Sequence, residues 1–307
     1  MKNIFLFLVC IIFNISCNSK NASTKPKVAI VISTLNNPWF VDLANIAAKN
    51  VQDLGYEAKI FDAQNNTSLE SDIFENLISS GFNAILFNPT DADGSIVNIQ
   101  KAKTAGIPVF CMDREVNSND AATSQILSDS YSGCVDIGMA FVKELPAQAE
   151  YVELLGLVSD NNTHSRSGGF HSVVDKFTGL KMVAQQSADF DRAKALEVME
   201  SMIQAHPDFK GVFCGNDAMA MGAYQAIVSA AKQKQIKVFG FDGAPDVVAK
   251  ISTGDLIATG MQHPEIMAQT AAKFADDFFK GKRDFPQRIP VEVEMVEKSN
   301  AKLFMKP

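Results

Sequence analysis

Polar side chains with paired donors and acceptors stand directly after several short apolar runs of this sequence. Asp113 and Arg114 follow one run, Asn88 follows another, and Asp242 follows a third. Planar carboxylate, amide and guanidinium groups can each meet two neighbouring hydroxyls of a small polyhydroxylated molecule. The same pattern recurs after two further runs, with Ser33, Asn36, Asn37, Asn216 and Asp217.

Each of these residues also has an ordinary structural interpretation, because Asn, Asp and Ser are favoured helix caps and turn formers. That interpretation suits Ser33, Asn65 and Asp217 when they are taken singly. It does not account for Arg114 or for the repeated choice of Asn, since caps require neither. Aromatic side chains, which suit the C–H faces of a sugar ring, occur close to the polar positions at Trp39, Phe40, Phe190 and Phe241. The residues together predict a sugar-binding cleft.

The elements that must position these residues alternate along the chain. Short β-rich runs are separated by amphipathic stretches of helical length, a pattern typical of parallel sheets covered by helices. The predicted strands are 27–32, 58–61, 84–87, 108–112, 149–154, 211–214 and 237–241. The predicted helices are 38–54, 68–80, 93–105, 132–143, 166–176, 191–205, 217–232 and 264–280. Because the pattern restarts near Ser128, we expect an α/β chain of two doubly wound, Rossmann-like domains, with the polar residues at the carboxyl ends of the strands.

The N-terminus carries an export signal. Lys2 precedes an apolar stretch over 4–15, which is too short to span a bilayer as a helix. Cys17 follows Ser16 as in the lipobox of bacterial lipoproteins, although Asn14 departs from the usual aliphatic residue. We therefore expect a signal peptide over 1–16, lipidation of Cys17 and a flexible polar tether over 17–26; ordinary cleavage beside an incidental cysteine is the alternative.

Composition limits the partners of the exported part. The net charge is -7 and no run of Lys or Arg occurs, so the sequence predicts no nucleic-acid partner. Cys111, Cys134 and Cys214 lie in apolar contexts without metal-ligand spacing and are expected to be buried thiols. A disulfide between two of them remains the alternative.

An enzyme is the first competing interpretation. The sequence contains no glycine-rich phosphate loop, no G-x-S-x-G elbow and no H-E-x-x-H motif. His164 and His263 are expected at the surface or in packing roles, and the acidic pair Asp91 and Asp93 reads as a cap or turn. We therefore predict no catalytic residue, no metal site and no cofactor.

Seven segments carry a family resemblance: KVAIVISTLNNPWF, LFNPTDAD, IPVFCMDRE, SADFDR, FCGNDAMAMGA, VFGFDGAPD and ATGMQHP. From about Val28 to the C-terminus the chain resembles the ribose binders of the periplasmic-binding family that serve bacterial ABC importers. The resemblance implies the type I periplasmic-binding fold, in which three crossover strands form a hinge between two domains that close over a sugar. It implies an N-terminal domain over 27–127 with 263–292 and a C-terminal domain over 128–262 with 293–307.

The ligand contacts of the ribose binders can be carried over by position. They fall on Ser33, Asn37, Trp39, Phe40, Asn88, Asp113, Arg114, Ser128, Arg166, Phe190, Asn216, Asp242 and Gln262. Trp39 departs from the phenylalanine that is usual there, and Leu157 stands at an isoleucine position. The larger indole would reshape one wall of the pocket, so the resemblance does not fix which sugar is bound.

The resemblance implies a protein that delivers a monosaccharide to an ABC permease, with D-ribose as the first candidate and allose, xylose or a polyol as alternatives. Together with the export signal and Cys17, it predicts a monomeric lipoprotein. A second alternative is a sugar-sensing partner of a chemoreceptor or sensor kinase, which would use the same closed form. A transcription repressor of this fold would need a helix-turn-helix before Val28, where this chain has its export signal.

Overall fold

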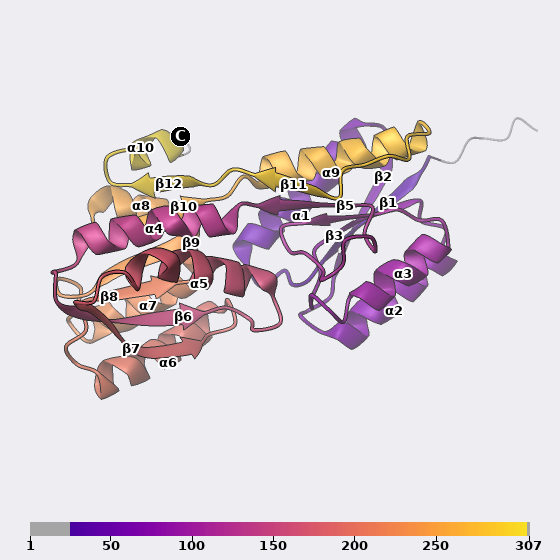
Figure 1. Cartoon of the computed structure of the whole chain (residues 1–307). Coiled ribbons are helices and arrows are strands. Elements are labelled where there is room, and N and C mark those ends of the chain that lie inside the picture. Colours follow the sequence, from indigo (N-terminus) through magenta and orange to yellow (C-terminus); the bar gives the residue numbers. More distant parts are fainter. Residues whose placement is uncertain (1–24, 306–307) are drawn as a thin grey trace, which may run out of the picture.

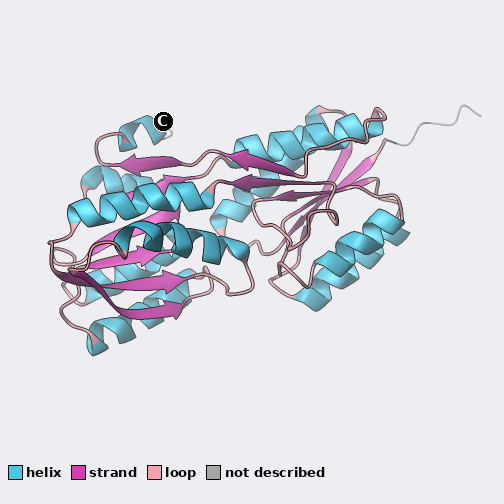
Figure 2. Ribbon diagram, in the orientation of Figure 1, coloured by secondary structure: helices cyan, strands magenta, loops and turns pink. Residues whose placement is uncertain are grey.

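The computed structural model describes residues 25–305, so the predicted signal peptide and Cys17 lie outside the described residues. Within that range the chain forms two α/β domains side by side (Figure 1). Each contains one six-stranded sheet between two layers of helices (Figure 2). This confirms the predicted class of two doubly wound domains.

The N-terminal sheet has the strand order β11-β5-β4-β3-β1-β2. Its strands are β1 (Lys27–Ile32), β2 (Glu57–Asp62), β3 (Ala84–Phe87), β4 (Val109–Met112), β5 (Ser124–Ser128) and β11 (Arg288–Val291). Helices α1 (Pro38–Asp53) and α9 (Pro264–Phe279) cover one face, and α2 (Thr67–Ser79) and α3 (Ile96–Thr104) cover the other. The run KVAIVI forms β1, an interior strand between β3 and the edge strand β2, and five of its six side chains are buried, as suits a strand covered on both faces.

The C-terminal sheet has the order β12-β10-β9-β8-β6-β7. Its strands are β6 (Ala149–Leu155), β7 (Leu180–Ser187), β8 (Gly211–Cys214), β9 (Lys237–Asp242), β10 (Ala258–Met261) and β12 (Glu294–Glu297). Helices α6 (Arg192–Ala205), α7 (Asp217–Ser229) and α8 (Pro245–Thr253) pack on one face. Helices α4 (Ser130–Glu144) and α5 (Asn161–Val174) pack on the other, and α10 (Ala301–Phe304) follows β12.

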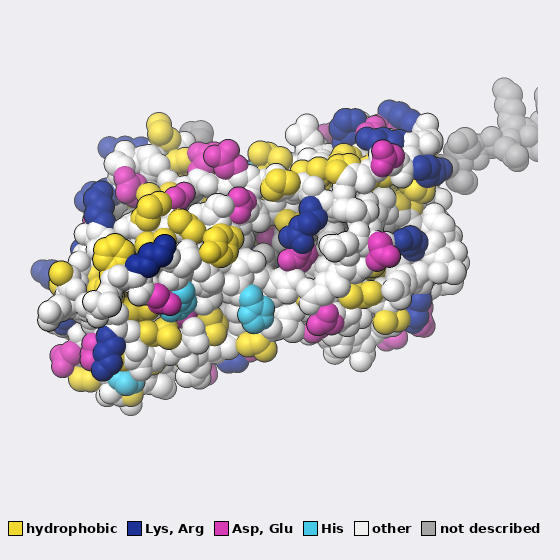
Figure 3. All heavy atoms as spheres, viewed as in Figure 1, with side chains coloured by type: hydrophobic (Ala, Val, Ile, Leu, Met, Phe, Trp, Pro, Cys, Tyr) yellow, Lys and Arg dark blue, Asp and Glu magenta, His cyan; other side chains and the backbone are white. Residues whose placement is uncertain are grey.

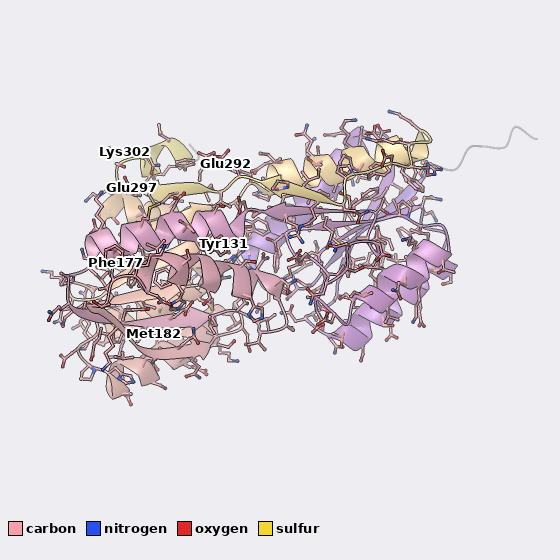
Figure 4. The ribbon with its side chains drawn as sticks, viewed as in Figure 1. Tyr131, Phe177, Met182, Glu292, Glu297 and Lys302 are labelled. Carbon is pink, nitrogen blue, oxygen red and sulfur yellow. The ribbon has the colours of Figure 1, made fainter. Side chains whose placement is uncertain are left out.

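The chain passes between the domains three times. The crossovers join β5 to α4, β10 to α9, and β11 to β12. Strand β11 runs parallel to β5, and the chain keeps its direction through Glu292, labelled in Figure 4, so β12 enters the second sheet antiparallel to β10. This edge strand is the one departure from the predicted parallel sheets.

Close packing fixes the third crossover. Val293 is buried, and a Cβ added to Gly133 of α4 would lie 2.6 Å from its Cγ1. A Cβ added to Gly260 of β10 would lie 3.2 Å from the same atom. Two glycines thus make room for one valine where the domains meet.

The visible surface has no strong segregation of charge. Lys and Arg side chains are scattered among Asp and Glu over the face shown in Figure 3. Tyr131, Phe177 and Met182 are partly exposed on the C-terminal domain (Figure 4), with exposed fractions of 50%, 46% and 38%. Such scattered apolar side chains are ordinary at a protein surface. Between residues 25 and 305, no helix combines the length and the apolar character needed to cross a membrane.

Candidate ligand-binding site

A polar cavity lies between the two domains, at the carboxyl ends of both sheets. Ten of the thirteen predicted contact residues line it: Asn37, Trp39, Phe40, Asp113, Arg114, Arg166, Phe190, Asn216, Asp242 and Gln262. Asp160 and Asn162 complete the wall and were not predicted. Three predicted residues, Ser33, Asn88 and Ser128, lie outside the lining.

Two of the cleft asparagines are also helix caps. The Asn37 side-chain oxygen accepts a hydrogen bond from the backbone N–H of Trp39 at 3.0 Å and begins α1. The Asn216 oxygen accepts from Met219 N–H at 2.9 Å and begins α7. An amide that caps through its oxygen keeps its NH₂ group as a donor, which an aspartate cap lacks. The capping and the ligand-binding interpretations are therefore compatible at these positions.

Arg166, on α5, lies at the floor of the cavity. Its Nη1 donates to the Gly215 carbonyl at 2.8 Å and lies 3.4 Å from Oδ1 of Asp242. Its guanidinium carbon lies 4.2 Å from the centre of the Phe241 ring. Backbone, carboxylate and aromatic ring together hold the guanidinium in one orientation.

Arg114 comes from the N-terminal domain and pairs across the cleft. Its Nε lies 2.6 Å from Oδ2 of Asp160, and both side chains are 3% exposed. Its guanidinium also lies 5.1 Å from the centre of the Phe40 ring and 5.9 Å from that of Phe190. Asp160 caps α5 through its other oxygen, which accepts from Asn162 N–H at 2.9 Å.

Two predicted residues that do not line the cavity form a hydrogen-bonded chain that leads to Asp113. The Ser33 hydroxyl donates to Asn88 Oδ1 at 2.6 Å, and Asn88 Nδ2 lies 3.3 Å from Asp113 Oδ2. Burial raises the pKa of Asp113 to about 7, partly offset by the positive charge of Arg166. Ser33 and Asn88 therefore orient a cavity residue.

Ser128 lies at the end of β5, where the first crossover begins. Its hydroxyl oxygen is buried without a hydrogen-bond partner among the described residues, and it does not line the cavity. The structure thus places this residue at the junction of the domains.

The backbone is strained at three cavity residues. Asp113 has φ 66°, Phe190 has φ 60° and Asp242 has φ 133°, all in the region that favours glycine. Such conformations persist only where the surrounding structure imposes them, and they concentrate at functional sites. Asp242 is further fixed by Gln262, whose Nε2 donates to its Oδ1 at 2.7 Å. Burial also raises the pKa of Asp242.

Apart from Arg114 Nε and Asp160 Oδ2, which pair with each other, four polar atoms of the cavity wall are buried without a hydrogen-bond partner among residues 25–305: Trp39 Nε1, Asp113 Oδ1, Arg166 Nε and Gln262 Oε1. Buried polar groups are nearly always hydrogen-bonded, and leaving one unpaired costs about 1–3 kcal/mol. The four atoms comprise two donors and two acceptors. They suit a ligand whose groups can both donate and accept, as hydroxyls do.

The domains are closed on each other. Ala92 N–H donates to the Ser159 carbonyl at 3.1 Å, and Asn36 Nδ2 donates to Asp191 Oδ2 at 3.1 Å across the cleft. The polar cavity has a volume of about 10 Å³ in this state. A water molecule needs roughly that much space, so a sugar can enter only if the two domains separate.

Phe190 keeps its place because residue 156 is a glycine. A Cβ at Gly156 would lie 2.0 Å from Phe190 Cζ. Gly156→Ala is therefore expected to push this ring into the cleft and to weaken ligand binding by about tenfold to a hundredfold. Isothermal titration calorimetry measures the change. Gly168→Ala is the matched control, because its Cβ would meet only Tyr131 at 3.8 Å; equal affinity of both variants would contradict this role of Gly156.

The other groups that could do chemistry lie apart from the cavity wall. His164 Nε2 lies 3.0 Å from the Val158 carbonyl, and His263 Nε2 lies 3.1 Å from Glu294. Among the described residues, no three His, Cys, Asp or Glu side chains are grouped so that they could hold a metal ion. Cys111, Cys134 and Cys214 are buried free thiols in the structure, so no disulfide joins any two of them.

Comparison with known proteins agrees with this architecture. A family model described as the periplasmic binding protein domain matches residues 28–283. The D-apiose import binding protein of Paraburkholderia graminis is 39% identical over 275 residues, covering 89% of this chain and 88% of the relative. The ribose import binding protein of Bacillus subtilis is 39% identical over 257 residues, covering 83% of this chain and 82% of the relative.

Solved structures share the fold closely. A galactofuranose binding protein has a TM-score of 0.87 at 27% identity, with 91% of this chain and 97% of the other covered. A periplasmic solute binding protein of Actinobacillus succinogenes with bound D-allose has a TM-score of 0.85 at 26% identity, with 91% and 100% covered.

Proposed function

We propose that this chain, which belongs to the periplasmic binding protein family, captures a neutral monosaccharide in its interdomain cleft and presents it to the permease of an ABC importer. Members of this family bind solutes and are not enzymes. The observation that carries the proposal is the set of four unpaired donors and acceptors, contributed by both domains and buried around one cavity. A ligand with several hydroxyls would satisfy all four.

D-ribose is our first candidate ligand and D-apiose the second. The ten predicted contacts that line the cavity support ribose, as does the relative from Bacillus subtilis. The relative from Paraburkholderia graminis, with its equal identity, supports apiose. Both are uncharged pentoses, in keeping with a site whose arginines are already close to carboxylates.

Titration with a panel of sugars tests the proposal directly. Trp39 is the only tryptophan of the chain and lines the cavity, so its fluorescence should change when a sugar binds. We expect saturable binding of D-ribose or D-apiose by fluorescence and calorimetry, and weaker binding of D-allose and D-xylose. Lack of a response to every monosaccharide would refute the proposal.

Closure converts binding into a signal for the permease. A ligand favours the closed state only through contacts that are missing in the open state. We propose that the two domains move as units about the three crossovers, one formed by residues 27–127 with 263–292 and the other by 128–262 with 293–307. We also propose that the protein acts as a monomer. The closed rims would then present a surface that the permease distinguishes from the open form.

Closure without sugar should depend on pH. The pKa of Asp113 is about 7 in the closed form, against 3.8 for an exposed carboxyl, so between these values the closed form holds a proton that the open form has released. Lowering the pH from about 8 to about 5 therefore favours closure, by at most roughly 3 kcal/mol for this group. Small-angle scattering should show a smaller radius of gyration at the lower pH. A wild-type response no larger than that of Asp113→Asn would contradict the prediction.

We also propose that the mature protein is attached to the membrane through a lipid on Cys17. The sequence around Cys17 supports this, and the polar segment over 17–26 would give the folded domains reach. Cys17→Ser should move the protein from the membrane fraction to the soluble fraction of cells. Retention of the variant in the membrane fraction would argue against acylation.

A further inference from the structure

A second, larger chamber lies beside the polar cavity. Its volume is about 750 Å³, within the range of ordinary ligand pockets and far above the 10 Å³ of the polar cavity. Seven of its lining residues also line the polar cavity, among them Trp39, Phe190 and Gln262. The two spaces therefore share a wall, and a group attached to a sugar in one can extend into the other.

The shared wall offers unpaired polar atoms to such a group. Trp39 is 8% exposed and Gln262 is 2% exposed. Trp39 Nε1 and Gln262 Oε1 have no hydrogen-bond partner among the described residues. One is a donor and the other an acceptor, so together they can bind an uncharged oxygen or hydroxyl at the junction.

Apolar side chains form part of the outer walls of the chamber. Pro38 and Ile46 contribute from the N-terminal domain, and Pro245, Met261 and Phe304 from the C-terminal domain. A flat or aliphatic group would be removed from water between them, which stabilises a complex by roughly 25 cal/mol per Å² of apolar surface buried.

The charge of the walls excludes anions. Seven Asp and Glu side chains line the chamber, against two arginines and one histidine. Arg114 is already paired with Asp160, and Arg192 lies 3.3 Å from Asp246. A phosphate or carboxylate in the chamber would meet a net negative field without a free guanidinium to bind it.

We propose that the cleft accepts glycosides as well as free sugars, with the sugar ring in the polar cavity and a neutral, partly apolar substituent in the outer chamber. This inference rests on the proposed binding of a monosaccharide. It extends the ligand class from pentoses to their uncharged O-glycosides, and it excludes sugar phosphates.

Calorimetry with phenyl β-D-ribofuranoside and phenyl β-D-apiofuranoside, each against its free sugar, tests this inference. At least one glycoside should bind within about threefold of its free sugar or more tightly, whereas D-ribose 5-phosphate should bind at least about tenfold more weakly than D-ribose. Ala218→Trp, which fills the chamber from the first turn of α7, should weaken glycoside binding by about tenfold or more and leave the free sugar within about threefold.

Ala230→Trp is the matched control, because Ala230 is exposed at the other end of α7. Should Ala218→Trp fail to fold, Ala193→Trp fills the same chamber from an exposed position on α6. If the protein binds a free sugar but neither glycoside, the inference is wrong and the proposed function still holds. Equal loss of sugar and glycoside binding in the filled variant would also overturn the inference, as would tight binding of D-ribose 5-phosphate. Lack of binding of every free sugar would instead overturn the proposed function.

Discussion

Arg166→Met is expected to weaken sugar binding by about a thousandfold. The guanidinium is 4% exposed, and its Nη1 lies between the Gly215 carbonyl and the Asp242 carboxylate. It also opposes the effect of burial on the pKa of Asp113 and of Asp242. Methionine keeps much of the volume but leaves both acids without this cation, so they would take up protons and lose their capacity as full acceptors.

Calorimetric titration with the best-bound sugar of the panel measures this loss. Arg283→Met is the control, since Arg283 is exposed, lines neither cavity and donates to the backbone carbonyls of Phe278 and Lys282. We expect this control to stay within about threefold of the wild type, because exposed polar side chains far from a site contribute little to it. Equal affinities of the two variants would show that Arg166 does not contact the sugar.

Locking the domains together is expected to prevent sugar binding in the polar cavity. Ala92 and Ser159 face each other across the cleft, with a backbone hydrogen bond of 3.1 Å between them. The double variant Ala92→Cys, Ser159→Cys should therefore form a disulfide on oxidation. Because the closed polar cavity has a volume of about 10 Å³, the oxidised protein cannot take a sugar ring into that cavity.

Stopped-flow fluorescence of Trp39 in a chain that starts at residue 25 measures the effect. Oxidised protein should give no sugar response, and reduction should restore it. The single variant Ala92→Cys, treated with the same oxidant, should bind normally because Cys111, Cys134 and Cys214 are buried. A normal association rate in the oxidised double variant would mean that the cavity fills without domain separation.

The buried strands and helices of the fold were predictable from the sequence, because the spacing of apolar residues along the chain follows the side chains that face the core. Predicted strands 27–32, 84–87 and 211–214 coincide with β1, β3 and β8. Five strands escaped prediction: β5, β7, β10, β11 and β12. Strands β7, β11 and β12 lie at sheet edges and carry exposed polar residues, and β5 and β10 are short runs of mixed polarity, so neither group shows a continuous apolar pattern.

Some helices begin at other residues than predicted, because side chains that cap a helix or form a turn determine where it begins. Helix α3 was predicted to begin at residue 93 but begins at Ile96, because Asp91 Oδ1 accepts from Asp93 and Gly94 N–H and holds a turn there. Helix α5 begins five residues before the predicted 166, where Asp160 caps it. Helix α8 was missed, and it is only nine residues long.

The same limits apply to the candidate site. The run Asp160-Asn161-Asn162 has the composition of an ordinary helix start, and nothing local to it indicates a partner. Its pairing with Arg114 depends on the closing of two domains, which local sequence does not encode. The role of all these residues in sugar binding stays a prediction until the titrations are done.

The three buried thiols make the protein a reporter of its own unfolding. Cys111 lies in β4, Cys134 in α4 and Cys214 in β8, and burial raises the pKa of each well above its ordinary value. An alkylating reagent reacts with thiolate. Each buried cysteine can therefore be modified only when the domain that contains it unfolds, locally or completely. The modification rate at Cys111 therefore measures how often the N-terminal domain unfolds. The rates at Cys134 and Cys214 measure the same for the C-terminal domain. A sugar that holds the domains together should slow all three rates in parallel.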